Sequence, residues 1–259
     1  MPTLPKTIAT VACASLLAAC PALAGTAAAH PAGHRHATHR HVHTHTNTHR
    51  HGQSTHGKAH EHGKPADHLA GLRRGAGHAI SAQLKVLRQL RTFADSLDLT
   101  DEGALLAALD ADIDAVQADL DAVADAGSRA DLHALMTAAI TGHRLGGLQV
   151  EVVAEADAVG AEAASLTPTV EALVGQLSEQ PGNAAAQAAL EEAMSLLGTV
   201  TAQVGNGDLG VIGFVLHISP TVGRAELHSD AVNVHVALES ISDMLAQAEA
   251  DIATAQAQV

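Results

Sequence analysis

The chain has 259 residues, a formal net charge of −14 at pH 7 and 19 histidines, but it has only two phenylalanines and no tryptophan or tyrosine. An acidic chain with so few aromatic side chains lacks both the positive surface and the stacking platforms of nucleic-acid-binding proteins, which excludes a nucleic-acid partner. The sequence also contains no G-x-S-x-G, H-E-x-x-H or P-loop motif, so we predict that the protein is not an enzyme and holds no organic cofactor.

Residues 1–24 are predicted to be a signal peptide. Their start has one lysine and no acidic residue, and an apolar stretch of about a dozen residues follows, which is too short to span a bilayer. Ala22 and Ala24 supply the small residues expected before a cleavage site at Gly25. The segment that ends at Cys20 also has the form of a bacterial lipobox, so a soluble exported protein and a lipoprotein anchored at Cys20 both remain open.

Both cysteines of the chain, Cys13 and Cys20, lie in this signal peptide. A chain cleaved before Gly25 therefore has no thiol, and any metal it holds is bound by nitrogen and oxygen ligands. The longest later apolar run, Leu209–Ile218, is too short for a transmembrane helix. We therefore predict a secreted or cell-envelope protein without a transmembrane segment.

The rest of the chain divides sharply by charge. Residues 25–74 contain seven Lys or Arg and two acidic residues, whereas residues 75–259 contain six Lys or Arg and twenty-six acidic residues. With histidine neutral, the two parts carry +5 and −20. Protonation of the histidines at acidic pH makes the first part far more positive, which favours its contact with anionic material.

Residues 25–73 are predicted to be a disordered, His-rich segment, because they contain too little apolar surface to offset the entropy of ordering. Many of its histidines form H-x-H pairs, and alternate residues of an extended chain project to the same side, so one pair can chelate one ion. Neutral imidazole is a common ligand of Zn²⁺, Ni²⁺ and Cu²⁺, and redundant ligands predict several labile ions. The candidate metal ligands are His34, His36, His39, His41, His43, His45, His49, His51, His60 and His62.

These patterns lead to two hypotheses about function. In the first, an exported protein captures or buffers divalent transition metal ions through the His-rich segment, which is carried by a helical scaffold. In the alternative, the protein is a structural or interaction protein of the cell envelope, and the segment is a pH-dependent electrostatic tether to anionic cell-wall material. The density of H-x-H pairs favours the first hypothesis, and the charge division favours the second.

From about residue 74, apolar residues recur at spacings of three and four, which predicts helices. Turn and capping signals divide this part into helices over 74–97, 101–126, 129–180 with a kink at Pro168, 183–218 and 223–257. The third helix is about twice as long as the first two. We therefore predict an all-α, elongated antiparallel helical bundle for residues 74–259, built as two tandem three-helix bundles that share the long third helix. A compact single bundle is the alternative.

Local signals refine this prediction. Ser128 and Asp131 match a capping box at the start of the third helix, with aspartate in place of glutamate. Two apolar stripes with strict 3-4 spacing predict the buried faces of two helices. They are Leu106, Leu109, Ile113, Val116, Leu120 and Val123 in one helix, and Leu227, Ala231, Val234, Leu238, Ile241, Leu245, Ala248, Ile252 and Ala255 in the other.

Two apparent motifs are rejected. Asp110–Asp121 imitates an EF-hand loop, but Ala115 stands where the loop needs glycine, so we interpret it as an acidic helix face. Gly205–Gly210 spells G-x-G-x-x-G, but its flanks are helical, so we expect an interruption in the fourth helix. Scattered histidines are predicted to be exposed or at the edge of the apolar stripes; they are His133, His143, His217, His228 and His235.

Several short motifs support a resemblance. They are Leu99-Thr100-Asp101-Glu102, His143-Arg144-Leu145, Ala154-Glu155-Ala156-Asp157, Ile218-Ser219-Pro220 and Ala248-Glu249-Ala250-Asp251. In these motifs the chain resembles a group of secreted, Ala-rich helical proteins of actinobacteria, over most of residues 78–256. His143 stands where that group has a tyrosine. The resemblance implies a helical fold and secretion, but no activity.

Overall fold

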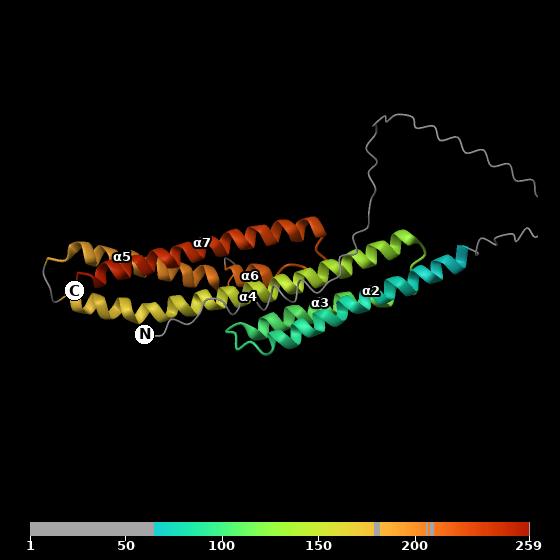
Figure 1. Cartoon of the computed structure of the whole chain (residues 1–259), viewed down its shortest axis with the longest axis horizontal. Coiled ribbons are helices and arrows are strands. Elements are labelled where there is room, and N and C mark those ends of the chain that lie inside the picture. The colour runs from blue at the N-terminus through green and yellow to red at the C-terminus, as the bar shows by residue number, and fades with distance from the viewer. Residues whose placement is uncertain (1–64, 179–181, 206, 208–209, 259) are drawn as a thin grey trace, which may run out of the picture.

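The computed structural model describes residues 65–178, 182–205, 207 and 210–258. Six helices and no strand are present in this part of the chain. The helices are α2 (Pro65–Ala94), α3 (Glu102–Ala122), α4 (Arg129–Ser178), α5 (Ala184–Val204), α6 (Val211–Leu216) and α7 (Arg224–Gln256). They pack into an elongated antiparallel assembly (Figure 1), which confirms the predicted all-α fold. The predicted signal peptide and residues 25–64 of the His-rich segment lie outside the described residues.

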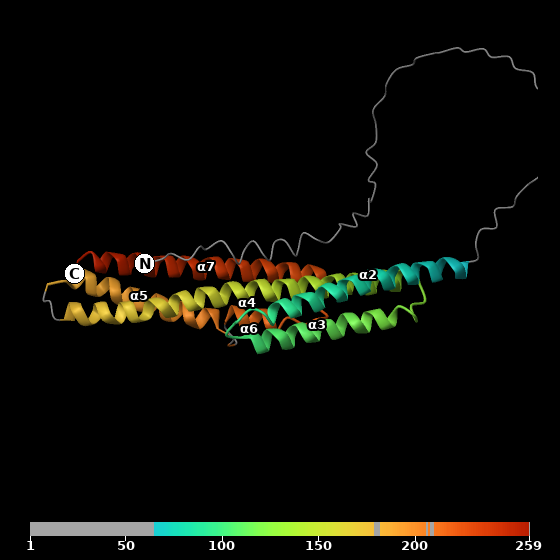
Figure 2. The ribbon, with the colours of Figure 1, turned by 60° about the horizontal axis from the view of Figure 1, so that its bottom comes forward.

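Helix α4 extends along both groups of helices that surround it. It has 50 residues, a length of about 75 Å. Helices α2 and α3 pack on each other and on the first half of α4, while α5 and α7 pack on each other and on its second half (Figures 1 and 2). The short α6 contacts α3, α4, α5 and α7 where the two groups meet. Pro168 lies inside α4, which continues to Ser178 without the one backbone hydrogen bond that proline cannot donate.

Helix α2 begins at Pro65, so the predicted start at residue 74 is wrong. Proline is well tolerated in the first turn of a helix, because its missing N–H would have no helical partner there. Leu69 and Leu72 then continue the apolar stripe toward the N-terminus and pack against the buried core. The change of composition near residue 74 therefore does not mark a change of structure, and the last residues of the segment 25–73 are helical.

The connection from α3 to α4 is held by local and long-range hydrogen bonds. The backbone N–H of Ser128 donates to Oδ2 of Asp131 at 2.8 Å, and the N–H of Asp131 donates to Oγ of Ser128 at 3.1 Å. These two bonds confirm the predicted capping box. In addition, Arg73 of α2 donates from Nε and Nη2 to the carbonyl oxygen of Ala126, at 3.1 and 2.8 Å. Helix α2 therefore also fixes this turn.

The fourth predicted helix, 183–218, is two helices in the structure. Helix α5 ends at Val204 and α6 begins at Val211. Glycines at 205, 207 and 210 lie between them, and glycine is the least favourable residue for a helix interior apart from proline. The predicted interruption at the G-x-G-x-x-G sequence is therefore confirmed. It divides the predicted helix completely, so that α6 is a separate short helix.

The two predicted apolar stripes have different outcomes. In α7, every predicted residue is buried except the half-buried Ala231, which confirms that stripe. In α3, the prediction is confirmed for Leu109, Val116 and Val123, which are buried, but not for the other three residues of the stripe. Leu106 and Ile113 lie at the flank of the helix, half-buried, whereas the buried line is Leu105, Leu109, Asp112 and Val116. This line also has helical spacing, and it places an aspartate in the core.

The buried apolar residues form two clusters. The first cluster lies among α2, α3 and the start of α4, and it ends at Val116 on α3 and Ala139 on α4. The second cluster contains most of the remaining core. Its residues nearest to the first cluster are Leu109 on α3 and Leu145 on α4. Between these limits, the buried positions on α3 and α4 include polar residues. They are Asp112, Thr141 and His143.

Candidate functional site

The ten predicted metal ligands lie outside the described residues. They are His34, His36, His39, His41, His43, His45, His49, His51, His60 and His62. The structure therefore gives no geometry for the predicted metal site.

The histidines of the helical body lie apart from one another. His78, His133, His217, His228 and His235 are all exposed. Within residues 65–178, 182–205 and 210–258, no group of three or more His, Cys, Asp or Glu side chains is placed to hold a metal ion. The described helices therefore provide no counterpart to the H-x-H pairs of the N-terminal segment.

The scattered histidines were predicted to be exposed or at the edge of the apolar stripes, and for His143 this prediction is wrong. Its side chain is buried, and its Nδ1 lies 2.5 Å from Oε1 of Gln83 on α2. Because an amide oxygen only accepts, Nδ1 is the protonated nitrogen in this contact. Burial, followed by the nearby positive charge of Arg144, lowers the pKa of His143, which favours the neutral form of the ring in the folded protein.

Asp112 is the most unusual buried group of the described helices. Its side chain is only 1 % exposed, and its Oδ2 has no hydrogen-bond partner among the described residues. Burial raises the pKa of Asp112 to about 7. The carboxyl group faces Gly146 of α4, because a Cβ atom at Gly146 would lie 3.6 Å from Oδ2. We did not predict this site from the sequence, although the spacing of Leu105, Leu109 and Val116 carried the signal.

The arginines Arg144 and Arg224 meet at a groove between α4 and α7. The groove has a volume of about 660 Å³. Helix α4 lines it with Arg144, Leu148 and Glu151, and α7 lines it mainly with Arg224, Leu227 and His228. The two arginines are about 80 residues apart in the sequence, so only the packing of the helices brings them together. No short motif in the sequence signals this site.

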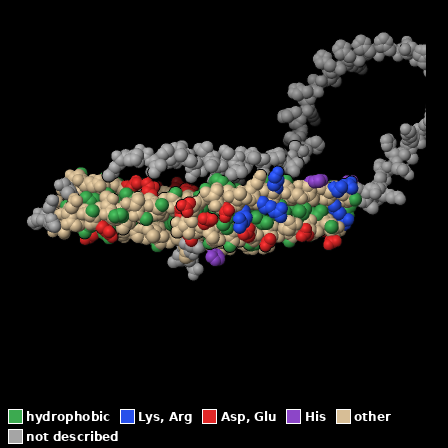
Figure 3. All heavy atoms as spheres, turned by 90° about the horizontal axis from the view of Figure 1, so that it is seen from below, with side chains coloured by type: hydrophobic (Ala, Val, Ile, Leu, Met, Phe, Trp, Pro, Cys, Tyr) green, Lys and Arg blue, Asp and Glu red, His purple; other side chains and the backbone are tan. Residues whose placement is uncertain are grey.

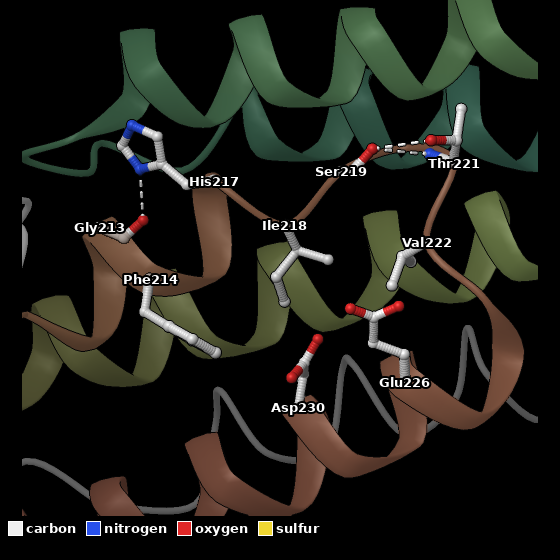
Figure 4. A pocket seen from close by; sticks show the side chains of 9 residues that line it. All are labelled: Gly213, Phe214, His217, Ile218, Ser219, Thr221, Val222, Glu226 and Asp230. Atoms are coloured by element: carbon white, nitrogen blue, oxygen red, sulfur yellow. Dashed lines mark hydrogen bonds between the residues drawn. The ribbon is translucent and has the colours of Figure 1, made fainter.

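A second cavity, of about 570 Å³, lies between α6, the loop that follows it and α7. Figure 4 shows the carboxylates of Glu226 and Asp230 close together beneath Ile218, while the ring of His217 lies at the other side. Nδ1 of His217 is 2.6 Å from the carbonyl oxygen of Gly213, to which it donates. The histidine is therefore held by its own helix and does not complete a ligand set with the two carboxylates.

Positive charge is unevenly distributed over the helical body. Helix α2 carries Arg73, Arg74, Lys85, Arg88 and Arg91, whereas residues 145–223 and 225–259 contain no Lys or Arg. In Figure 3 the basic side chains accordingly gather over the half where α2 and α3 lie. Arg91 forms a two-point contact with Asp110, at 2.6 and 3.2 Å, on the acidic face of α3. The half formed by α5 and α7 is strongly acidic.

None of the described helices combines the length and the apolar character that crossing a membrane requires. A comparison of the chain with protein-family models, with curated proteins and with solved structures finds no match.

Proposed function

We propose that the protein is exported and captures or buffers divalent transition metal ions, Zn²⁺, Ni²⁺ or Cu²⁺, through its His-rich N-terminal segment. The observation that carries this proposal is the set of ten histidines in H-x-H pairs between residues 34 and 62. Each pair supplies two borderline nitrogen ligands at a spacing suited to one ion, and the chain after residue 24 contains no cysteine that would bind such ions more tightly. The repetition favours several exchangeable ions over one closed site.

The charge of the helical body supports the same proposal. Residues 75–259 carry twenty-six acidic side chains and six basic ones. Such a body attracts cations to its surroundings and raises their concentration near the histidines. We interpret the body as two three-helix bundles that share α4, and we assign it the role of a scaffold that carries the segment.

Titration of the metal-free protein with zinc at pH 7.5, followed by calorimetry, tests the proposal. We expect several ions per chain with affinity in the micromolar range, and we expect binding to weaken below about pH 6, because protonated imidazole does not coordinate metal. Replacing the ten candidate histidines with serine should remove this binding.

The matched control replaces the exposed body histidines His78, His133 and His235 with serine and leaves the segment unchanged. This variant should bind as many ions as the parent protein. The proposal fails if the parent binds zinc no more tightly than millimolar, or if the ten-histidine variant retains the full number of ions.

The charge division favours the second function, a tether to anionic cell-wall material. In this function, the segment binds through protonated histidines and its six Lys or Arg residues. Sedimentation with purified anionic cell-wall polymer should then show binding that strengthens from pH 8 to pH 5, weakens with added salt and persists in EDTA. Binding that is equal at both pH values contradicts the tether, and binding that EDTA abolishes assigns the contact to metal instead.

A further inference from the structure

We propose that the groove between α4 and α7 binds an aliphatic molecule that ends in one anionic group, a carboxylate or a phosphate. The groove is a site of the helical body, so this proposal is independent of metal capture by the N-terminal segment. Its volume of about 660 Å³ is in the range of small-molecule sites.

Positive charge is concentrated at one end of the groove. Residues 75–259 contain only six Lys or Arg, and two of them, Arg144 and Arg224, line this groove. Both side chains are exposed, and neither takes part in a hydrogen bond or ion pair within the described part of the chain. Their guanidinium groups are therefore available for an anionic group, which arginine binds with two parallel hydrogen bonds.

The start of α7 adds to this positive end. Arg224 and Ala225 are the first residues of a helix of 33 residues, and both line the groove. The preceding Gly223 has no side chain that caps the helix. The first backbone N–H groups of α7 therefore have no side-chain cap, and the positive end of the helix dipole favours an anion at this place.

The middle of the groove is apolar. Leu148 of α4 and Leu227 of α7 are both buried members of the second core cluster, and they also line the groove. Ala231 lies further along α7. Because these side chains offer no hydrogen bond, this part of the groove favours an aliphatic chain over a polar ligand.

The other end of the groove limits the ligand to one anionic group. Helices α4 and α7 run in the same direction (Figure 1), so the two arginines lie at one end, and Glu151 lies toward the other. Arg144 and Glu151 are seven residues apart on α4, a distance of about 10 Å along the helix axis. If an aliphatic ligand of about this length carried a second anionic group at its other end, that group would approach Glu151 and be repelled.

Calorimetric titration of the full-length protein in EDTA with decanoate, below its micelle-forming concentration, tests the proposal. We expect one decanoate per chain. Decanol, which lacks the charge, and decanedioate, which has a second carboxylate, should each bind at least about tenfold more weakly. The double variant Arg144→Gln/Arg224→Gln keeps both side-chain stems and should also bind decanoate at least about tenfold more weakly.

The matched control is Arg129→Gln, which removes an exposed arginine from α4 outside the groove. It should bind decanoate like the parent protein, and circular dichroism should show all variants equally folded. The proposal is overturned if decanoate does not bind, if decanol binds as tightly as decanoate, or if the double variant binds like the control. Since EDTA removes metal from every titration, none of these results depends on the proposed metal capture.

Discussion

The parent protein should become less stable as the pH rises from 4 to 7, and the variant Asp112→Asn should lose much less stability over this range. Burial raises the pKa of Asp112 to about 7, while an aspartate in the unfolded chain titrates near its ordinary value. The folded protein therefore binds one proton more than the unfolded chain between these two values. The stabilisation is complete below the unfolded pKa and is lost as the pH rises through the folded pKa, and it amounts to about 4 kcal/mol in total.

Other groups change stability over the same pH range. Burial also raises the pKa of Asp119, which adds to the effect of Asp112 in the same direction. His143 acts in the opposite direction, because its lowered pKa favours its neutral form in the folded state. Its contribution to stability is present above the unfolded pKa of histidine and is lost as the pH falls. The parent protein and the variant share both of these groups, so their difference isolates Asp112.

Urea unfolding of the metal-free protein, followed by circular dichroism, measures this difference at pH 4.5 and pH 8. The variant should have the greater free energy of unfolding at pH 8, with a much smaller difference at pH 4.5. Asp114→Asn is the matched control, because Asp114 lies on the same helix but is exposed. If Asp112→Asn and Asp114→Asn have the same pH dependence, the buried carboxyl group does not control the stability of this part of the fold.

The variant Gly146→Val should destabilise the protein by about 3 kcal/mol. A Cβ atom at Gly146 would lie 2.6 Å from Cδ2 of Leu87 and 3.2 Å from Cδ2 of Leu109. Both leucines are fully buried, so neither side chain can move aside without displacing other core residues. Glycine at this position therefore allows α4 to approach α2 and α3 closely.

Gly175→Val provides the matched control on the same helix. Gly175 is exposed, and nothing lies within 4 Å of the place where its Cβ atom would be. Valine is somewhat more favourable than glycine in a helix, so this variant should be as stable as the parent or slightly more stable. Thermal unfolding of the three proteins at one pH measures the effect. Equal melting temperatures for the two variants would show that the contact at Gly146 is not tight.

Most of the helix boundaries were predictable, because they depend on local chemistry. The capping box of Ser128 and Asp131 marks the start of α4, and the spacing of the apolar residues in α7 marks its buried face. The start of α2 was not predicted, because the charged and histidine-rich composition before residue 74 concealed the apolar contacts of Leu69 and Leu72. Local composition is a weaker guide to a helix than the position of its apolar residues.

The buried polar residues could not be predicted from local patterns. In α3, Leu105 and Leu106 each begin a stripe with helical spacing, and only the partner helices decide which stripe is buried. The burial of His143 depends in the same way on Gln83 of another helix. The groove at Arg144 and Arg224 arises from two distant segments. Such sites depend on tertiary packing, whereas the H-x-H pairs of the N-terminal segment are visible in the sequence alone.

The long helix α4 sets the distance between the two ends of the helical body. The described part of the chain begins at Pro65, at one tip, and α7 ends near the opposite tip (Figure 1). Pro65 is therefore separated from the C-terminal end of α7 by a helical body longer than α4 itself, whose own length is about 75 Å. If the C-terminal tip is docked on a surface, Pro65 lies farther from that surface than the Debye length of physiological salt.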